Sequence, residues 1–256
     1  KYKEIKGFKV QTLATDTVAS AIEGATWASG GAMNTARGYL AGAGIQTAAL
    51  GIAGYTSTNV AIVEQYNGTS WTEIADVNTA RESLAGCGTT TAALAFGGYG
   101  PTHTAVTESW NGSAWTEVND LNTARTGLAG CGIQTAALAY GGTAPPDTAV
   151  AESWNGTSWT EVNDLNTARS TLGGFGLQTA ALAFGGGVNP KQQTELWNGS
   201  SWTEVNDLNT GRANLAANGT TTSGLTYGGN NPPTFYANTE AWDGTNWTEV
   251  ADLAST

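Results

Sequence analysis

The chain has 256 residues, only 12% of them charged, and a formal net charge of −11 at pH 7. This acidic balance argues against binding to nucleic acid or to an anionic membrane surface, because both attract proteins that carry a basic patch. No apolar run approaches the roughly 20 residues of a membrane-spanning helix, so we expect a soluble protein without membrane insertion.

Residues 1–20 lie outside the pattern that organises the rest of the chain. They hold four of the ten basic residues, and residues 1–10 alternate polar and apolar side chains in a way that suits one exposed or edge strand. We interpret residues 1–20 as an attachment or oligomerisation segment, with a frayed terminus as the alternative. The first residue is Lys1 and not Met, which leaves the true start of the protein open.

From residue 21 to residue 256 the chain is a repeat array, which we treat as one domain. A phrase that reads Trp-Asn-Gly-Thr-Ser-Trp-Thr-Glu-Val-Asn-Asp-Leu-Asn-Thr-Ala-Arg at residues 154–169 recurs with small changes. Its copies end 44, 44, 44 and 43 residues apart, at Arg37, Arg81, Arg125, Arg169 and Arg212. A degenerate half-repeat occupies residues 22–33, and full units start near residues 34, 78, 122, 166 and 209.

The unit that starts near residue 122 contains four short stretches with the composition of strands. They are a small-residue stretch, an apolar stretch before Gly-Gly, and two stretches that flank an Asn-Gly pair, at 128–132, 135–140, 148–154 and 159–162. The Asn-Gly pair predicts a hairpin whose two turn residues both have positive φ. Four strands in about 44 residues predict an all-β fold, a β-propeller of five four-stranded blades. Six blades, with a partial blade from the N-terminal half-repeat, are the alternative.

Three features of the unit resemble the kelch repeat: a Gly-Gly after the second strand, an aromatic residue on the third and a Trp on the fourth. The match covers about residues 34–252. The repeated phrase and the opening residues 2–8 are similar to kelch-like proteins encoded by bacteriophages of marine bacteria. This resemblance implies a virion structural or tail-fibre protein, located on the virion or outside the cell, and it implies no particular ligand.

The copies share a scaffold in which one arginine and one outer-strand tryptophan recur in every unit. We interpret the arginines as bridges between neighbouring blades through a carboxylate or a carbonyl oxygen. A positively charged functional ring is the alternative. The tryptophans would pack the blades together: Trp71, Trp115, Trp159, Trp202 and Trp247. Cys87 and Cys131, at equivalent places in neighbouring units, are expected to be buried and unpaired.

The units differ in length only between the Gly-Gly pair and the glutamate of the third strand. Strand alternation predicts that these loops share one face with the residues after each arginine, opposite the Asn-Gly hairpins. Loops on a rigid scaffold often bind ligands, and aromatic residues among polar neighbours suit sugar or protein surfaces. The candidate ligand-binding residues are Tyr55, Asn59, Tyr99, His103, Asp147, Asn189, Lys191, Asn231, Phe235 and Tyr236. Drift in unconstrained loops is the alternative.

The sequence offers little support for catalysis or for a metal site. His103 is the single histidine and lies in a variable loop, so a His-dependent triad or dyad has little support. No phosphate-binding loop, dinucleotide fingerprint or dense acidic calcium loop is present. We therefore predict that the protein is not an enzyme and uses no cofactor and no metal.

The function that we expect is a phage virion structural or tail-fibre-associated binding module. It would recognise a host-surface glycan or protein through the variable loops. One alternative is a propeller that decorates the virion or bridges other virion proteins without a ligand of its own. Another is a cellular kelch-like scaffold or a secreted lectin. Ligand, host and oligomeric state are not determined by the sequence.

Overall fold

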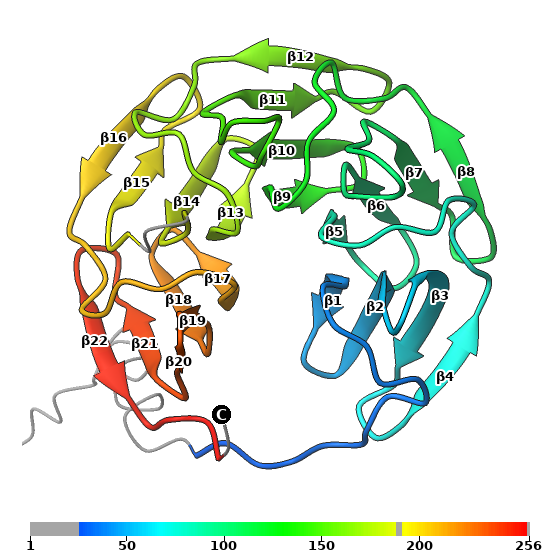
Figure 1. Ribbon diagram of the computed structural model, residues 1–256, viewed down its shortest axis with the longest axis horizontal. Coiled ribbons are helices and arrows are strands. Elements are labelled where there is room, and N and C mark those ends of the chain that lie inside the picture. The colour runs from blue at the N-terminus through cyan, green and yellow to red at the C-terminus, as the bar shows by residue number, and fades with distance from the viewer. Residues whose placement is uncertain (1–25, 188–190, 255–256) are drawn as a thin grey trace, which may run out of the picture.

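The computed structural model describes residues 26–187 and 191–254. The strands form five four-stranded antiparallel sheets and one two-stranded hairpin. The four-stranded sheets stand around a central axis as the blades of a propeller, and in each blade the strands follow one another outward from the axis (Figure 1). The predicted all-β propeller with five four-stranded blades is confirmed, and it is consistent with a kelch-like fold.

Each blade runs from an inner strand beside the axis to an outer strand on the rim. The first blade comprises β1 (Ala41–Ile45), β2 (Ala48–Tyr55), β3 (Asn59–Tyr66) and β4 (Trp71–Ile74), and the second comprises β5 (Ala85–Gly88), β6 (Ala93–Phe96), β7 (Thr107–Trp110) and β8 (Trp115–Val118). The third comprises β9 (Ala129–Ile133), β10 (Ala136–Tyr140), β11 (Ala151–Trp154) and β12 (Trp159–Val162). The fourth comprises β13 (Gly173–Leu177), β14 (Ala180–Phe184), β15 (Thr194–Trp197) and β16 (Trp202–Val205). The fifth comprises β17 (Ala216–Thr220), β18 (Ser223–Tyr227), β21 (Thr239–Trp242) and β22 (Trp247–Val250), with the hairpin β19 (Asn230–Asn231) and β20 (Thr234–Phe235) inserted after β18.

The inner strands are rich in glycine and alanine because they converge on the axis. A Cβ atom placed on Gly86 of β5 would lie 3.1 Å from the Cβ of Ala41 in β1 and 3.1 Å from the carbonyl oxygen of Gly42. Both distances are tighter than most Cβ contacts in proteins, so a side chain here would require a neighbouring strand to move by a few tenths of an ångström. Glycine at this position therefore lets the second blade approach the first.

The turns between the third and fourth strands are four-residue loops. In the first blade Tyr66 pairs with Trp71, and Asn67 Oδ1 accepts hydrogen bonds from the N–H groups of Thr69 (3.0 Å) and Ser70 (2.9 Å). Gly68 has a φ of 94°, whereas Asn67 is not left-handed. The prediction that both turn residues have positive φ is therefore wrong for the asparagine, because its side chain satisfies the turn's N–H groups instead.

Three of the four junctions between consecutive blades have an aromatic pair, and two of these three add a hydrogen bond. Phe96, the last residue of β6, lies 4.9 Å between ring centroids from Trp159 in the next blade. The same junction recurs in Tyr140–Trp202 at 5.0 Å and Phe184–Trp247 at 4.8 Å. The indole Nε1 of Trp159 donates to Thr107 Oγ1 of the preceding blade, and Trp247 donates likewise to Thr194 Oγ1, both at 3.1 Å. The outer-strand tryptophans therefore contact the blade before their own.

The segment before the first blade spans the distance from the fifth blade to the first (Figure 1). Trp27 lies 4.9 Å between ring centroids from Tyr227, and its Nε1 donates to Thr239 Oγ1 at 3.1 Å. These are the two contacts that Trp159 and Trp247 make at their blade junctions. The described part of the half-repeat therefore holds the place of an outer strand in a sixth position, while the proposed attachment segment 1–20 lies outside the described residues.

Candidate functional site

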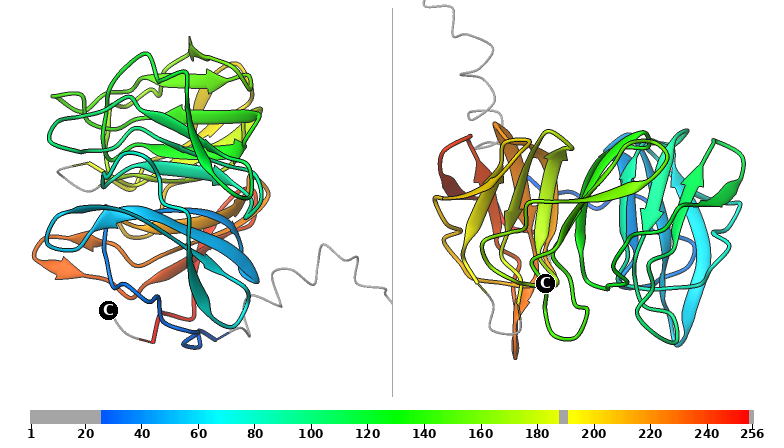
Figure 2. Two further views of the ribbon diagram at one scale, coloured as in Figure 1. Left: turned by 90° about the vertical axis from the view of Figure 1, so that its right-hand side faces the viewer. Right: turned by 90° about the horizontal axis from the view of Figure 1, so that it is seen from above.

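The variable loops and the residues after each arginine meet at one end of the propeller. Glu82 and Tyr99 exchange backbone hydrogen bonds of 2.9 and 2.7 Å, and the equivalent bridges join Gly38 to Tyr55, Thr126 to Thr143 and Ala213 to Asn230. We call this end the loop face. Figure 2 shows the β19–β20 hairpin projecting from it. The two sets of residues therefore share a face, as strand alternation predicts, and the Asn-Gly turns lie at the opposite end.

Aromatic side chains are exposed on the loop face. Tyr55 is 38% exposed, Tyr99 37% and Phe235 70%. Tyr39, which follows Arg37 by two residues, is 60% exposed and is not among the candidates that the loop pattern predicts. The sequence could have indicated it, because Tyr39 is aromatic whereas the equivalent residues of the next two units are Ser83 and Gly127.

Four candidate residues from the first and second blades form one connected group. Tyr55 and Asn59 are paired across the loop between β2 and β3. The Asn59 side-chain amide donates to the carbonyl oxygens of Tyr99 (3.0 Å) and Gly100 (3.2 Å). The rings of Tyr99 and His103 meet edge to face, with centroids 5.5 Å apart. Asn59 therefore positions the neighbouring loop, and Tyr55, Tyr99 and His103 present the rings.

The other candidates are distributed over the third, fourth and fifth blades. Asp147 is half-buried and accepts a 2.8 Å hydrogen bond from Thr143 Oγ1, and Lys191 Nζ donates to the Ala168 carbonyl oxygen at 3.3 Å. Asn231, Phe235 and Tyr236 belong to the β19–β20 hairpin and the residue after it. Asn189 lies outside the described residues.

A series of backbone hydrogen bonds runs around the axis beneath these side chains. The second residue after each arginine has a left-handed backbone: Tyr39 (φ 55°), Ser83 (52°), Gly127 (60°), Thr171 (52°) and Asn214 (54°). Each N–H donates to the carbonyl oxygen of its predecessor, at 2.8 Å for Ser83 to Tyr39, 2.8 Å for Gly127 to Ser83, 2.6 Å for Thr171 to Gly127 and 2.9 Å for Asn214 to Thr171. Non-glycine residues persist in this region only where the surrounding structure holds them. The loop face therefore stands on a rigid backbone.

The five arginines of the chain are buried in ion pairs with the glutamate of the third strand. The pairs are Arg37–Glu64, Arg81–Glu108, Arg125–Glu152, Arg169–Glu195 and Arg212–Glu240, with N···O distances of 2.5 to 3.2 Å. Burial raises the pKa of Glu64, but hydrogen bonds from Arg37 and from the N–H groups of Asn34 and Thr35 outweigh it, so the pKa lies below its ordinary value. The arginines therefore do not form an exposed positive ring.

From the sequence we expected each arginine to bridge two blades through a carboxylate, and the ion pairs show that this expectation is wrong. Each arginine pairs with the glutamate of its own unit. Arg81 and its partner Glu108 belong to the same unit. The link to the preceding blade is the backbone carbonyl oxygen of Arg81, which accepts a 3.0 Å hydrogen bond from the Gly54 N–H. The glutamate cannot serve the neighbouring blade because it also holds the N–H groups of Asn78 and Thr79, just before its own arginine.

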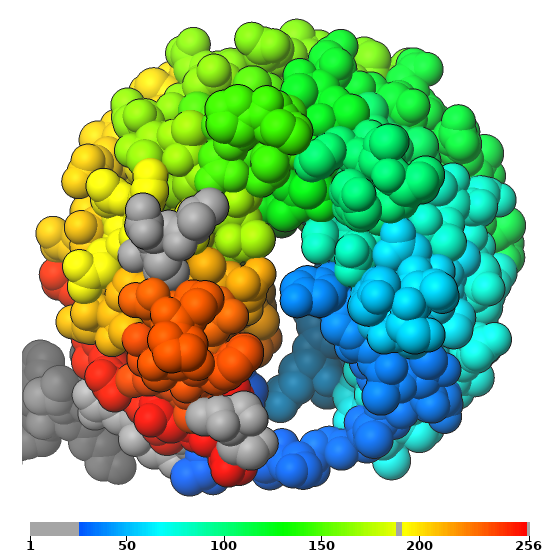
Figure 3. Space-filling view, in the orientation of Figure 1, coloured from blue at the N-terminus to red at the C-terminus, as the bar shows by residue number. Residues whose placement is uncertain are grey.

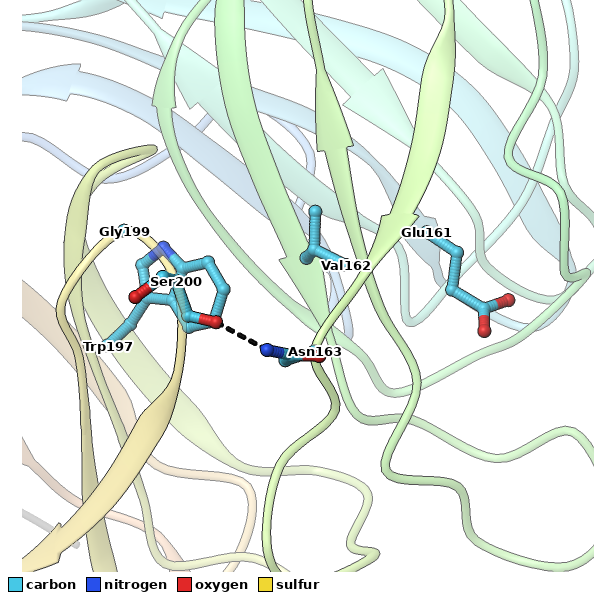
Figure 4. Close-up of a pocket in the computed structure, with 6 residues that line it drawn as sticks. All are labelled: Glu161, Val162, Asn163, Trp197, Gly199 and Ser200. Atoms are coloured by element: carbon cyan, nitrogen blue, oxygen red, sulfur yellow. Dashed lines mark hydrogen bonds between the residues drawn. The ribbon is translucent and has the colours of Figure 1, made fainter.

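A groove of about 470 Å³ opens on the rim between the third and fourth blades. It is lined by Glu161, Val162, Asn163, Trp197, Gly199 and Ser200 (Figure 4). Asn163 Nδ2 donates to the Ser200 carbonyl oxygen at 2.7 Å across it. A groove of the same residue positions lies one blade further on, where Asn206 bonds to Thr245. Because the groove recurs with the repeat, we attribute it to blade geometry and not to a ligand.

The described residues offer few groups for catalysis. Among them no three His, Cys, Asp or Glu side chains converge in a way that could hold a metal ion, and no helix is long and apolar enough to cross a membrane. Cys87 and Cys131 are free and buried. Burial raises the pKa of Cys131 to about 12, so at neutral pH it is a thiol and a poor nucleophile.

Comparison with known proteins adds no family to this description. No protein-family model matches the chain, and no curated protein is significantly similar to it in sequence. The repeat pattern and the loop face are therefore the basis for an argument about function.

Proposed function

We propose that the chain is a non-enzymatic binding module of a bacteriophage virion, either a tail-fibre-associated or another structural component. It recognises a host-surface glycan or protein through the loop face. The observation that carries the binding role is the exposure of Tyr39, Tyr55, Tyr99 and Phe235 on that one face. Exposed aromatic side chains among polar neighbours are typical of binding surfaces. The virion role rests on the resemblance of the repeated phrase to phage kelch-like proteins.

The charges of the loop face favour a neutral ligand over a polyanion. All five arginines are held in buried ion pairs, and Lys191 is the one lysine among the described residues. A polyanionic glycan or a nucleic acid would need clustered cations. A neutral glycan, stacked on tyrosine rings, or a protein surface is the better fit.

The experiment measures binding of the purified chain to a glycan array and to host cells. Tyr99→Ala together with Phe235→Ala should reduce binding at least tenfold if these rings contact the ligand. The matched control is Ile45→Ala with Leu177→Ala, which removes side chains that are 69% and 56% exposed at the opposite end of the inner strands. Equal losses in both double variants, with folding intact, would count against the loop face.

A decorating or bridging role without a ligand is the second candidate, and one observation favours it. Ile45, Ile133 and Leu177 are exposed as the last residues of the inner strands β1, β9 and β13. Exposed aliphatic side chains at that end would suit contact with another virion protein. Purified particles test both roles, because a chain that is absent from them would favour a cellular kelch-like scaffold or a secreted lectin.

A further inference from the structure

The ring of inner strands is interrupted between the fifth blade and the first. The inner strands of consecutive blades pack on one another: β1 on β5, β5 on β9, β9 on β13 and β13 on β17. Figure 3 shows the axial channel extending between the first blade, in blue, and the fifth, in orange, toward the blue segment at the rim. We call the space between β17–β18 and β1–β2 the open sector. This description concerns residues 26–187 and 191–254.

The side chains that face the open sector are less buried than their counterparts at complete junctions. Asn218 of β17 is exposed, whereas Phe175, its counterpart in β13, is 4% exposed. Leu225 and Tyr227 of β18 are half-buried, whereas the equivalent Leu182 and Phe184 are fully buried. Among the described residues, the surface on which a next blade would pack is therefore open.

The open sector has the place of one blade, because its rim is already occupied in the manner of an outer strand. Trp27 makes with Tyr227 and Thr239 the contacts that Trp247 makes with Phe184 and Thr194. Trp27 also precedes Trp71 by 44 residues, the period of the repeat. On the other side, the Gly31 carbonyl oxygen accepts a hydrogen bond from Trp71 Nε1 at 3.0 Å. Within the described residues, the place of the outer strand of a sixth blade is therefore filled, and the places of its three inner strands are not.

Backbone groups at both edges of the open sector continue the pattern of the complete junctions. The N–H groups of Gly54, Gly98, Gly142 and Gly186 each donate to the carbonyl oxygen of the next unit's arginine, at 2.9 to 3.0 Å. Gly229 is the fifth member of this set, and within the described residues its N–H has no such arginine to meet. The series of left-handed residues likewise ends at the Tyr39 N–H and the Asn214 carbonyl oxygen. A sixth unit would supply a partner for each of these groups.

The fifth blade already directs the chain into the open sector. The Leu253 N–H donates to the Ala237 carbonyl oxygen at 2.9 Å, as the Leu208 N–H donates to that of Gln192 at 3.0 Å on the way from the fourth blade to the fifth. Asp252 Oδ1 accepts the Thr239 N–H just as Asp207 Oδ1 accepts that of Thr194. Leu208 is 2% exposed because the next blade covers it, whereas Leu253 remains half-buried.

We propose that the open sector receives the first three strands of a further unit of this same repeat, joined to the chain beyond Leu253. The segment that carries Trp27 would then be the outer strand of a completed sixth blade. The incoming unit must bring its own arginine and its own third-strand glutamate, because every complete unit buries that pair. This inference concerns assembly of the ring and is independent of the proposed function.

Residues 1–25 lack the chemistry of such a unit. They contain no arginine, and the residue that precedes Glu64 by one period of 44 is Ser20. A buried guanidinium or carboxylate without its partner is strongly destabilising, so the two must come together. We therefore assign the open sector to a unit with the full pattern and not to the N-terminal segment.

The test extends the chain after Thr256 with a second copy of residues 125–154, which run from the arginine of the third unit through its third strand. In the preceding units the arginine follows the counterpart of Asp252 by five residues, so the copy starts in register. We expect amide exchange at Gly229 and Tyr39 to slow by about tenfold or more, with a higher unfolding midpoint. The matched control is the same extension with Arg125→Ala in the copy, which should give little protection. Unchanged exchange in the extended chain would overturn the proposal.

Two further experiments test the alternative occupants of the open sector, which are the N-terminal segment and a second copy of the chain. Deletion of residues 1–25 should leave exchange at Gly229 unchanged, and faster exchange would mean that the N-terminal segment already fills the open sector. Sedimentation should show a monomer with and without the extension. A dimer that the extension dissociates would assign the open sector to a second copy of the chain and would overturn the proposal.

Discussion

The indole N–H of Trp159 donates to the hydroxyl of Thr107 in the preceding blade, at 3.1 Å. Three of the junctions described above have this bond, made by Trp159, Trp247 and Trp27 to a threonine at the start of a third strand. Val63 and Ala151 hold the threonine's place before Trp115 and Trp202, and the Nε1 atoms of these two tryptophans are buried without a hydrogen-bond partner. The junctions therefore differ in whether the indole N–H is satisfied, although Trp115, Trp159, Trp202 and Trp247 are all buried.

Val63→Thr should stabilise the protein by about 1 kcal/mol, because the new hydroxyl gives the buried Trp115 N–H a partner in a side chain of nearly the same shape. The measurement is the free energy of unfolding in urea. In a Trp115→Phe background the same substitution should bring no gain. A gain that persists there would show that the hydroxyl acts through another contact.

The converse substitution, Thr107→Val, should cost about 1–3 kcal/mol, since it leaves the Trp159 N–H buried and unsatisfied. Thermal and urea unfolding would both report the loss. Thr116→Val in the exposed outer strand of the same blade is the control and should stay within about 0.5 kcal/mol of the parent.

Glu108→Gln should destabilise the protein by about 3–5 kcal/mol, because it leaves the Arg81 guanidinium buried without a counter-charge. Glu117→Gln makes the same chemical change on the exposed rim of that blade and should have almost no effect. Comparable losses from the two substitutions would mean that the buried pair has no special role.

Ala53→Gly should stabilise the first blade. Ala53 has a φ of 56°, whereas the glycines at its place in the other units have φ values of 64° to 66°. A left-handed conformation costs an L-residue roughly 1–2 kcal/mol, and part of that gain is lost to the greater entropy of glycine in the unfolded chain. We expect a net gain of about 0.5–1 kcal/mol in urea unfolding. Ala95→Gly, in the buried strand β6, should instead destabilise.

Stability should fall as the pH decreases below about 4.5, the ordinary pKa of the Glu64 carboxyl. Its pKa is lower in the folded state, so the unfolded state binds the proton first, and stability is lost as the pH falls through the folded pKa. Unfolding free energies between pH 7 and pH 3 would show this. Glu64→Gln should be less stable at pH 7 and should lose less on acidification. An equal pH dependence in both proteins would contradict the assignment.

Much of the architecture could be predicted because it depends on the spacing of residues along the chain. The 44-residue period gives the number of complete blades, and the distances between arginine, Gly-Gly and tryptophan give the order of strands. The common face of the variable loops follows from strand alternation. The ligand-binding role of its residues stays a prediction, and Asn59 illustrates the limit. Its amide binds carbonyl oxygens 40 and 41 residues away, in a loop whose position the sequence does not specify.

By itself the sequence determined the repeat, its four strands and the residues that every blade must bury, because these depend on period, small size and fixed spacing. Only the tertiary structure decided how the ring is joined. The partner of each arginine, the conformation of the Asn-Gly turn and the place of Trp27 all depend on groups that folding brings together. Trp27 bonds to Thr239, 212 residues along the chain. A contact between the two ends of a ring has no local signature, since it forms only when the intervening blades have set the curvature.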